Sequence, residues 1–70
     1  MPVQANWAIA AIDAITAARD AESGTIYAAT DIQAQLITGA LAKTHSEALR
    51  SGKIKVITDT EIDNPYFELG

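Results

Sequence analysis

The segment from Thr30 to Gly52 carries two copies of a pattern that starts helices, and it constrains the fold of this chain more than any other feature. The pattern is Thr-x-x-Gln/Glu, formed by Thr30 with Gln33 and by Thr44 with Glu47. In such a capping box the Thr hydroxyl accepts the backbone N–H three residues on, and the Gln or Glu side chain returns to the N–H of the Thr. Gly52 then supplies a residue type that ends helices. Two starts and one stop predict two short helices joined by a tight turn.

The two predicted helices span residues 31–42 and 45–51. One continuous helix over residues 31–51, with Thr44 exposed midway, is the alternative that the same residues allow. Gly39 inside the first helix costs about 1 kcal/mol relative to Ala. The side chains predicted to point inward are Ile32, Leu36, Ala40, Ile37 and Leu41 in the first helix and Ala48 and Leu49 in the second.

Two short runs of β-prone residues flank this helical segment and predict a two-stranded ribbon. Residues 25–29 read TIYAA, and residues 53–58 read KIKVIT. A ribbon this small needs a helix face behind it, and a dimer could join two ribbons into a four-stranded sheet. Side chains of the second run alternate between two faces, one with Ile54 and Val56 and the other with Lys53, Lys55 and Ile57.

A segment rich in isoleucine and alanine predicts the longest helix, over residues 6–22. Asn6 is a residue type that caps helix starts, and Gly24 fits the left-handed position that ends helices. The alanines would let another helix approach closely, so the apolar face packs either on the chain's own core or against a helix of a second subunit. This apolar face consists of Trp7, Ile9, Ile12, Ala14 and Ile15. The opposite, solvent-exposed side, which we call the wet side, consists of Asp13, Thr16, Arg19 and Asp20.

The last residues, NPYFELG, predict an aromatic tail. Residues 1–63 then form a single small domain, and residues 64–70 form the tail. Asn64-Pro65 imposes a turn or an extended break. Tyr66 and Phe67 either fold back onto the core of their own chain or form an arm that docks on a neighbouring subunit or partner.

Size and composition predict a marginal monomer. A domain of 70 residues buries only about 60% of the surface that its unfolded chain exposes. The chain has no cysteine, so disulfides and thiolate zinc sites cannot add to a small core. Hydrophobic residues make up 49% of it, which is enough to bury further apolar surface against partner chains. We expect one small α+β domain that forms a homodimer or a higher oligomer.

Charge is distributed unevenly along the chain, whose formal net charge is −4. Residues 43–55 hold four of the five basic residues, while both flanks are acidic. This balance argues against a protein that mainly coats nucleic acid. The sequence shows neither a signal-peptide pattern nor an apolar stretch long enough to span a membrane, so we expect a cytoplasmic protein without membrane contacts.

Residue types that carry chemistry are few. His45 is the only histidine, and no second imidazole, cysteine or paired carboxylate stands at ligand spacing from it. Asp59, Glu61 and Asp63 alternate, but Asn64 stands where a calcium loop needs glycine. The four glycines are isolated from one another, so a glycine-rich phosphate loop is absent from the sequence. We therefore expect no catalytic residues, no metal site, no cofactor and no enzymatic activity.

The basic segment also allows a DNA-binding interpretation. The run ALRSGKIKV at residues 48–56 resembles the end of the recognition helix in excisionase-type DNA-binding domains, where a Ser-Gly-Lys turn leads into a strand. Ala34 fits the family's pattern, whereas Gly39 stands one position later than the family's small turn residue. The resemblance implies a helix-turn-helix regulator whose phosphate or base contacts are Lys43, His45, Arg50, Lys53 and Lys55.

The interpretation that we favour is a small non-catalytic protein-interaction module that self-associates and occupies the surface of a protein partner. A small acidic chain without catalytic clusters fits accessory proteins of the kind that phages and mobile elements encode, including inhibitors and particle components. The predicted partner contacts are Trp7, Tyr66 and Phe67, together with exposed parts of the Ile/Ala helix. The helix-turn-helix regulator is the alternative.

Overall fold

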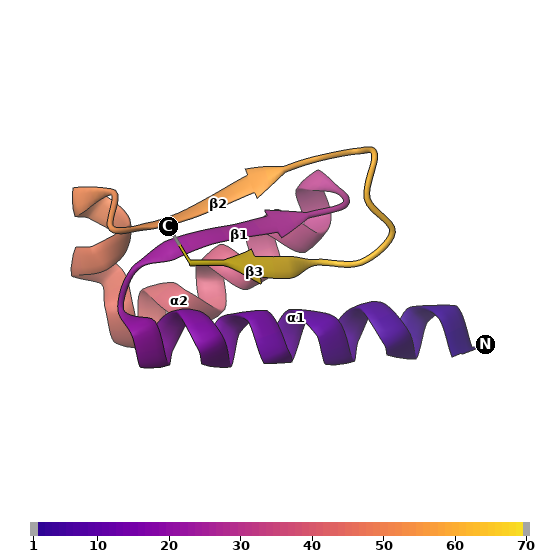
Figure 1. The fold of residues 1–70 in the computed structure, drawn as a ribbon, viewed down its shortest axis with the longest axis horizontal. Helices are drawn as coiled ribbons and strands as arrows, with labels where there is room; N and C mark the ends of the chain where they lie inside the picture. The colour runs from indigo at the N-terminus through magenta and orange to yellow at the C-terminus, as the bar shows by residue number, and fades with distance from the viewer. Residues whose placement is uncertain (1, 70) are drawn as a thin grey trace.

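The computed structural model describes residues 2–69, which fold into two helices and three strands. The elements follow in the order α1 (Pro2–Ala21), β1 (Gly24–Ala28), α2 (Asp31–Ser51), β2 (Ile54–Thr58) and β3 (Tyr66–Glu68) (Figure 1). The chain is therefore a small α+β protein, as its sequence predicts. Its middle three elements form a β-α-β unit, in which α2 carries the chain from the end of β1 back to the start of β2.

The three strands form one sheet in the order β2-β1-β3. The central strand, β1, pairs with β2 in parallel and with β3 in antiparallel orientation. The two strands predicted from the sequence thus pair with each other, but the ribbon is extended by a third strand that the sequence analysis did not predict. The predicted tail supplies that strand, because Tyr66–Glu68 folds back onto the central strand of its own chain.

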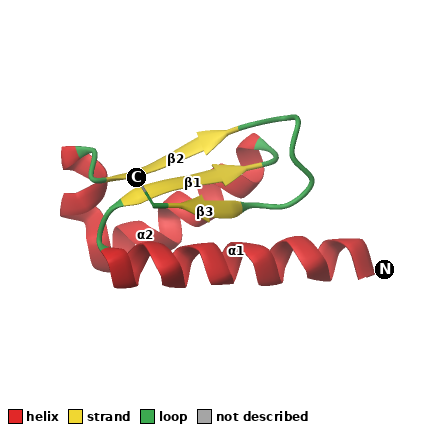
Figure 2. Cartoon of the chain, viewed as in Figure 1, coloured by secondary structure: helices red, strands yellow, loops and turns green. Residues whose placement is uncertain are grey.

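Both helices cover the same face of the sheet (Figure 2). The first helix packs against β1 and β3, and the second against β2 and β1. Alternate side chains of each strand, such as Ile26, Ile54 and Phe67, point towards the helices and join the core. The remaining side chains define what we term the open sheet face: Thr25, Tyr27, Lys55, Ile57, Tyr66 and Glu68.

The ends of α1 differ from the sequence prediction. The helix begins at Pro2, a residue favoured in the first turn because it has no N–H to leave unpaired. Asn6 lies inside the helix, so the prediction that it caps the start is wrong. At the other end, Glu22 and not Gly24 takes the left-handed conformation, with φ of 60°. Gly24 instead begins β1, with φ of 127°.

The first of the two capping boxes forms, and the second does not. The hydroxyl of Thr30 accepts the N–H of Gln33 at 3.2 Å, which confirms Thr30 as the cap of α2. The Gln33 side chain reaches one residue further than predicted, because its Oε1 accepts the N–H of Ala29 at 3.0 Å. The hydroxyl of Thr44 lies 2.8 Å from Nδ1 of His45. This second threonine therefore contacts its neighbour and does not cap the helical segment that follows it.

A kink at His45 divides α2 into two helical segments. The backbone of His45 leaves the helical region, with φ of −132° and ψ of 42°. Both interpretations of the sequence therefore hold in part, since one helical span contains two segments that meet without a turn between them. Gly52 ends the second segment in the left-handed conformation predicted for it, with φ of 84°.

The core lies between the sheet and the helices, and on α1 it is built from alanine. Ile9 and Ile12 are 58% and 62% exposed, so they do not pack on the chain's own core, which was one of the two predicted alternatives, whereas Ile15 does pack there. Alanine side chains allow this part of the helix to lie close to the strands. The buried residues are Ala11, Ala14, Ala18, Ile26, Ala28, Ile37, Leu41 and Ile54.

The buried face of α2 is also rotated from the one that the sequence analysis predicts. Ile37 and Leu41 are buried, as predicted, but Ile32 and Leu36 are 71% and 57% exposed. The cap explains the rotation. Gln33 is buried because its side chain turns towards the N–H that it binds, and residues four and eight positions further on share its face.

Candidate functional site

The three predicted partner contacts do not form one surface. Trp7 and Phe67 are half-buried and pack against the hydrophobic core, from α1 and β3 respectively. Tyr66 points to the other side of β3 and is 44% exposed on the open sheet face. Of the three, Tyr66 therefore offers the most side-chain surface to a partner.

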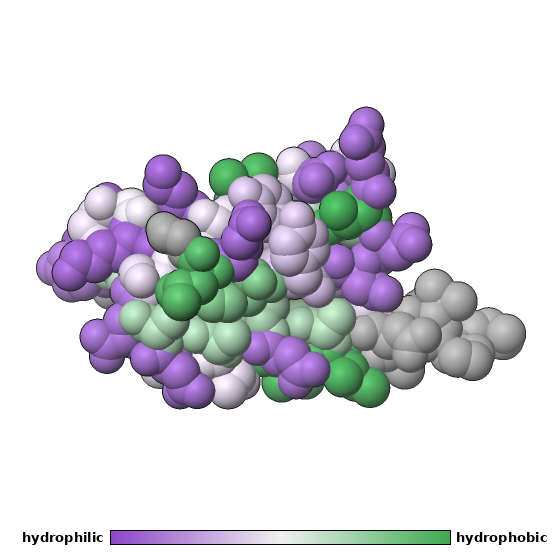
Figure 3. Space-filling model, in the orientation of Figure 1, coloured by the Kyte–Doolittle hydropathy of each residue, from purple (hydrophilic) through white to green (hydrophobic). Residues whose placement is uncertain are grey.

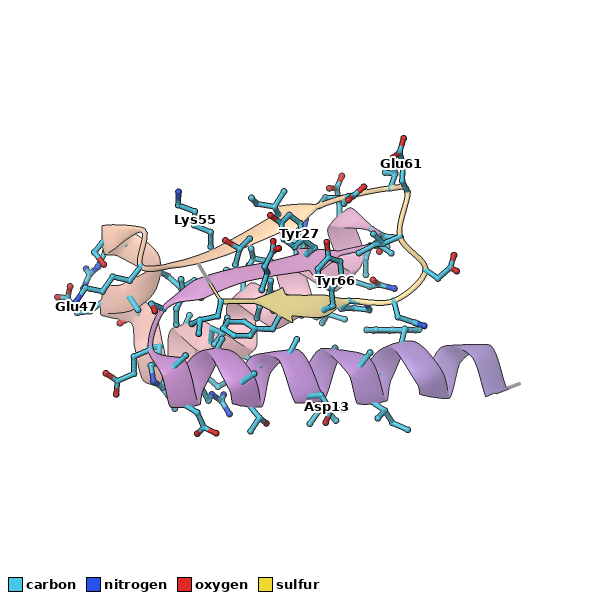
Figure 4. The ribbon with its side chains drawn as sticks, viewed as in Figure 1. Asp13, Tyr27, Glu47, Lys55, Glu61 and Tyr66 are labelled. Atoms are coloured by element: carbon cyan, nitrogen blue, oxygen red, sulfur yellow. The ribbon has the colours of Figure 1, made fainter. Side chains whose placement is uncertain are left out.

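The open sheet face carries an aromatic pair that the sequence analysis missed. Register places Ile57, Tyr27 and Tyr66 side by side across the three strands. The rings of the two tyrosines stack with centroids 5.0 Å apart and planes 25° from parallel (Figure 4). Alternation within TIYAA could have identified Tyr27, because it must point away from its buried neighbour Ile26.

A second row of the same face pairs opposite charges around a threonine. Lys55 and Glu68 each lie beside Thr25, one on either side of β1. Partial burial of the Tyr27 side chain raises its pKa, and the negative charge of Glu68 raises this pKa further. The tyrosine hydroxyl therefore stays protonated at neutral pH, and the face offers hydroxyl, ammonium and carboxylate groups within a small area.

The basic residues of the DNA-binding alternative are distributed over separate parts of the molecule. Lys43 is exposed on α2, while Lys55 belongs to the open sheet face. Arg50 forms an ion pair of 3.2 Å with Glu47 on the same helix, with both side chains largely exposed. Glu47 thus partly neutralises the positive charge of Arg50 that would attract a phosphate group.

The kink of α2 forms a cavity of about 500 Å³ whose lining mixes charges. His45 and Lys53 line it together with Glu22 and Glu47. The acids would repel a phosphate backbone. A helix-turn-helix motif also usually has a turn of three to four residues between its helices. In this chain only the kinked residue His45 separates the two segments of α2. The DNA-binding regulator stays a prediction, with less support from this geometry than the interaction module has.

Four large aliphatic side chains lie on the side of the helices that faces away from the sheet. We term them the helix-layer patch: Ile9 and Ile12 of α1, and Ile32 and Leu36 of α2. Each is more than half exposed. Figure 3 shows hydrophobic residues, in green, at the lower edge of α1, with hydrophilic residues, in purple, between them.

The two halves of this patch flank the seam between the helices. Arg19 of α1 donates a hydrogen bond of 3.0 Å to the carbonyl oxygen of Ala40 in α2, which marks where the helices meet. Both helices run in the same direction (Figure 1). Ile12 lies two turns before Arg19 on the same helix face, and Leu36 lies about one turn before Ala40. Exposed aliphatic side chains therefore line both sides of one seam.

Comparisons with known proteins gave no relatives: no family model, no curated protein and no solved structure matches this chain. Among the residues that the structure describes, no helix has the length and apolar character to cross a membrane. Within the same residues, no three histidine or carboxylate side chains gather closely enough to hold a metal ion.

Proposed function

We propose that this chain is a non-catalytic protein-interaction module that binds a protein partner through its helix-layer patch. Its action is steric, because the module covers part of the partner's surface, as an inhibitor or a particle component does. The partner presents apolar side chains to the seam between α1 and α2. The single observation that carries this proposal is the orientation of α1, whose alanines face the sheet while Ile9 and Ile12 face outward.

This orientation is unfavourable for the isolated domain. Fully burying an isoleucine contributes about 1.5 to 3 kcal/mol relative to leaving it exposed. A domain of 70 residues has little core to spare, yet the helix-layer patch leaves three isoleucines and one leucine more than half exposed. A partner that covers the patch would recover this free energy on binding. Large apolar side chains that stay exposed on neighbouring elements are typical of interaction surfaces in soluble proteins.

The space around the patch is open to a partner. Gly39 lies on α2 one turn beyond Leu36, and a methyl group added there would meet nothing within 4 Å. The carbonyl of Ala40 next to it already accepts the hydrogen bond from Arg19, so a partner need not satisfy it. An apolar segment, such as one face of an amphipathic helix, could therefore lie along the seam without burying unpaired backbone groups.

Paired substitutions in the patch test this proposal. The variant Ile12→Gln/Leu36→Gln replaces both sides of the seam with good helix formers, so its thermal stability should match that of the wild type. Thr38→Gln is the matched control, because Thr38 is exposed on α2 outside the patch. Affinity capture from the native host, followed by mass spectrometry, should recover a partner with the wild type and the control but not with the double variant. A partner that the double variant recovers equally well contradicts the proposal.

A further inference from the structure

The outer edge of β2 carries a row of unpaired backbone groups. Among residues 2–69 no strand lies beyond β2, so the sheet ends there (Figure 1). Lys53 accepts a hydrogen bond from the N–H of Gly24, and Asp59 donates its N–H to Ala28, so both residues point their backbone towards β1. Backbone groups alternate between the two sides of a strand. The N–H and C=O groups of Ile54, Val56 and Thr58 therefore point away from β1, into the space beyond the edge.

We propose that this edge pairs with the same edge of a second copy of the chain, in antiparallel orientation, to give a continuous six-stranded sheet. The two-fold axis passes through Val56, which faces Val56 of the second copy. Ile54 then faces Thr58 of the other chain, on both sides of the axis. All three outward-pointing residues enter the ladder, and each pair exchanges two hydrogen bonds.

Charges along β2 and at the residues that flank it, Lys53 and Asp59, are complementary in this register. Lys53 of each copy lies opposite Asp59 of the other, which forms two symmetry-related pairs of opposite charge. Lys55 lies opposite Ile57 and has Asp59 and Lys55 of the other copy on its diagonals. Lysines on an edge strand usually oppose edge-to-edge pairing, but here the directly opposite residue is an acid or an aliphatic side chain and never another lysine.

Neighbouring two-fold registers are less favourable. A register centred on Lys55 places the two copies of Lys55 directly opposite each other, which is destabilising. A register centred on Ile57 keeps Lys55 opposite Asp59, but only Val56 and Thr58 remain within the paired strands. It therefore forms fewer hydrogen bonds than the register centred on Val56, which uses the full length of β2.

The outer edge of β2 is accessible because α2 lies against one face of the sheet and not beyond its edge (Figure 1). The helix contacts both β2 and β1 on one face of the sheet, so it does not cover the outer backbone of β2. The edge and the helix-layer patch are separate surfaces, and pairing of the edge does not depend on the function proposed for the patch. Self-association through the edge leaves the patch of each copy free for a partner.

A proline substitution tests the backbone contribution. Val56→Pro removes an N–H that points away from β1, so the ladder within the monomer keeps its bonds, and proline is tolerated at such edge positions. Val56→Ala is the matched control, because it loses the same side-chain packing but keeps the N–H. In sedimentation equilibrium the wild type should be dimeric. The proline variant should dimerise at least tenfold more weakly than the alanine variant, since two hydrogen bonds are lost across the axis.

A charge exchange tests the register without relying on proline. Lys53→Glu alone places Glu opposite Asp, and Asp59→Lys alone places Lys opposite Lys, so each variant should dimerise more weakly than the wild type. In an equimolar mixture both pairs become complementary, and the mixture should form heterodimers in preference to either homodimer. Native mass spectrometry distinguishes the species, because the two variants differ from each other in mass.

Cysteine pairs locate the contact directly. A mixture of Lys55→Cys and Ile57→Cys chains should form an intermolecular disulfide faster than either variant alone, because residues 55 and 57 of different copies are opposite in the proposed register. A wild-type chain that stays monomeric overturns the proposal. So does a dimer that Ile12→Gln/Leu36→Gln abolishes while Val56→Pro leaves it intact, since that outcome assigns the second copy to the helix-layer patch.

Discussion

Arg19 joins the two helices of this protein, since its Nη2 donates a hydrogen bond of 3.0 Å to the carbonyl oxygen of Ala40. The sequence pattern predicts Arg19 on the solvent-exposed side of α1. Its side chain is half-buried instead and crosses the seam to α2, and its Nε is buried without a partner. The long aliphatic stem covers apolar surface on the way, as arginine stems commonly do.

We expect Arg19→Ala to lower the free energy of unfolding by about 1.5 kcal/mol, through the loss of a charged hydrogen bond and of packing along the stem. Arg50→Ala is the control, because Arg50 pairs with Glu47 in water, and its loss should cost less than about 0.5 kcal/mol. Urea denaturation followed by circular dichroism measures both. Equal losses for the two variants would show that the contact with Ala40 contributes nothing specific.

Two leucines on α2 should differ sharply in their effect on stability. Leu41 is fully buried, so Leu41→Ala should cost about 3 kcal/mol by leaving a cavity in the core. Leu36 is 57% exposed, and Leu36→Ala should cost less than about 1 kcal/mol. Thermal unfolding of both variants checks the ranking. The reverse order would support the inward face that the sequence analysis assigned to this helix.

The glycines at 24 and 39 should respond to alanine in opposite directions. At Gly24 a Cβ atom would lie 2.5 Å from Cε1 of Phe67 and 2.9 Å from the carbonyl oxygen of Glu68, at a φ that L residues rarely adopt. Gly24→Ala should therefore destabilise the protein by about 2 kcal/mol or more and loosen β3. Gly39→Ala fills open space within a helix and should stabilise it by about 1 kcal/mol. Urea titrations compare the two, and a destabilising Gly39→Ala would contradict the open surroundings of that residue.

The two capping patterns provide another matched comparison. Thr30→Ala removes the oxygen that accepts the N–H of Gln33 and should cost about 1 kcal/mol. Thr44→Ala removes a hydroxyl that contacts the exposed ring of its neighbour His45, so the cost should stay below about 0.5 kcal/mol. Chemical denaturation of the single variants gives both values. Equal costs would mean that Thr44 caps the second segment of α2 in solution.

The ionisation of Tyr27 should depend on Glu68. Burial and the carboxylate raise the pKa of Tyr27 in the folded protein, so the protonated side chain favours folding. This contribution is fully present below the ordinary tyrosine pKa of about 10 and is lost as pH rises through the folded pKa. Glu68→Gln should lower the pKa of Tyr27 towards its ordinary value. Tyrosinate absorbance measures the titration, with Tyr66→Phe in both proteins so that this neighbouring ring does not contribute. A titration midpoint that Glu68→Gln leaves unchanged would show that burial alone sets it.

Much of the fold follows from local sequence features. Thr30 and Gly52 bound the central helix, and alternation in residues 54–57 separates Ile54 from Lys55 as predicted. The third strand was not predictable in the same way, because Tyr66–Glu68 is too short to show alternation and forms only by pairing with β1. A strand this short depends on its tertiary context.

Which face of each helix is buried was harder to predict than the presence of the helices. Isoleucine is more apolar than alanine, so hydropathy favours Ile9 and Ile12 as core residues. The acidic positions of α1 contained the better information, because Asp13 and Asp20 lie opposite the face formed by Ala11 and Ala18. Arg19 obscures that pattern, because its charge predicts a solvent-exposed position although its side chain lies at the seam with α2.

The position of β1 at the centre of the sheet also sets the order in which the chain can fold. Both strands that pair with β1 come later in the sequence, and the nearer one is reached only after the whole of α2. During synthesis, α1 and β1 emerge first. The backbone N–H and C=O groups on both edges of β1 then have no strand to pair with until β2 and β3 follow. The sheet therefore assembles late and through contacts distant in sequence, which slows folding relative to a helical bundle of this size. Until β2 and β3 pair with it, β1 stays exposed in the nascent chain, although it is the most deeply buried strand of the folded protein.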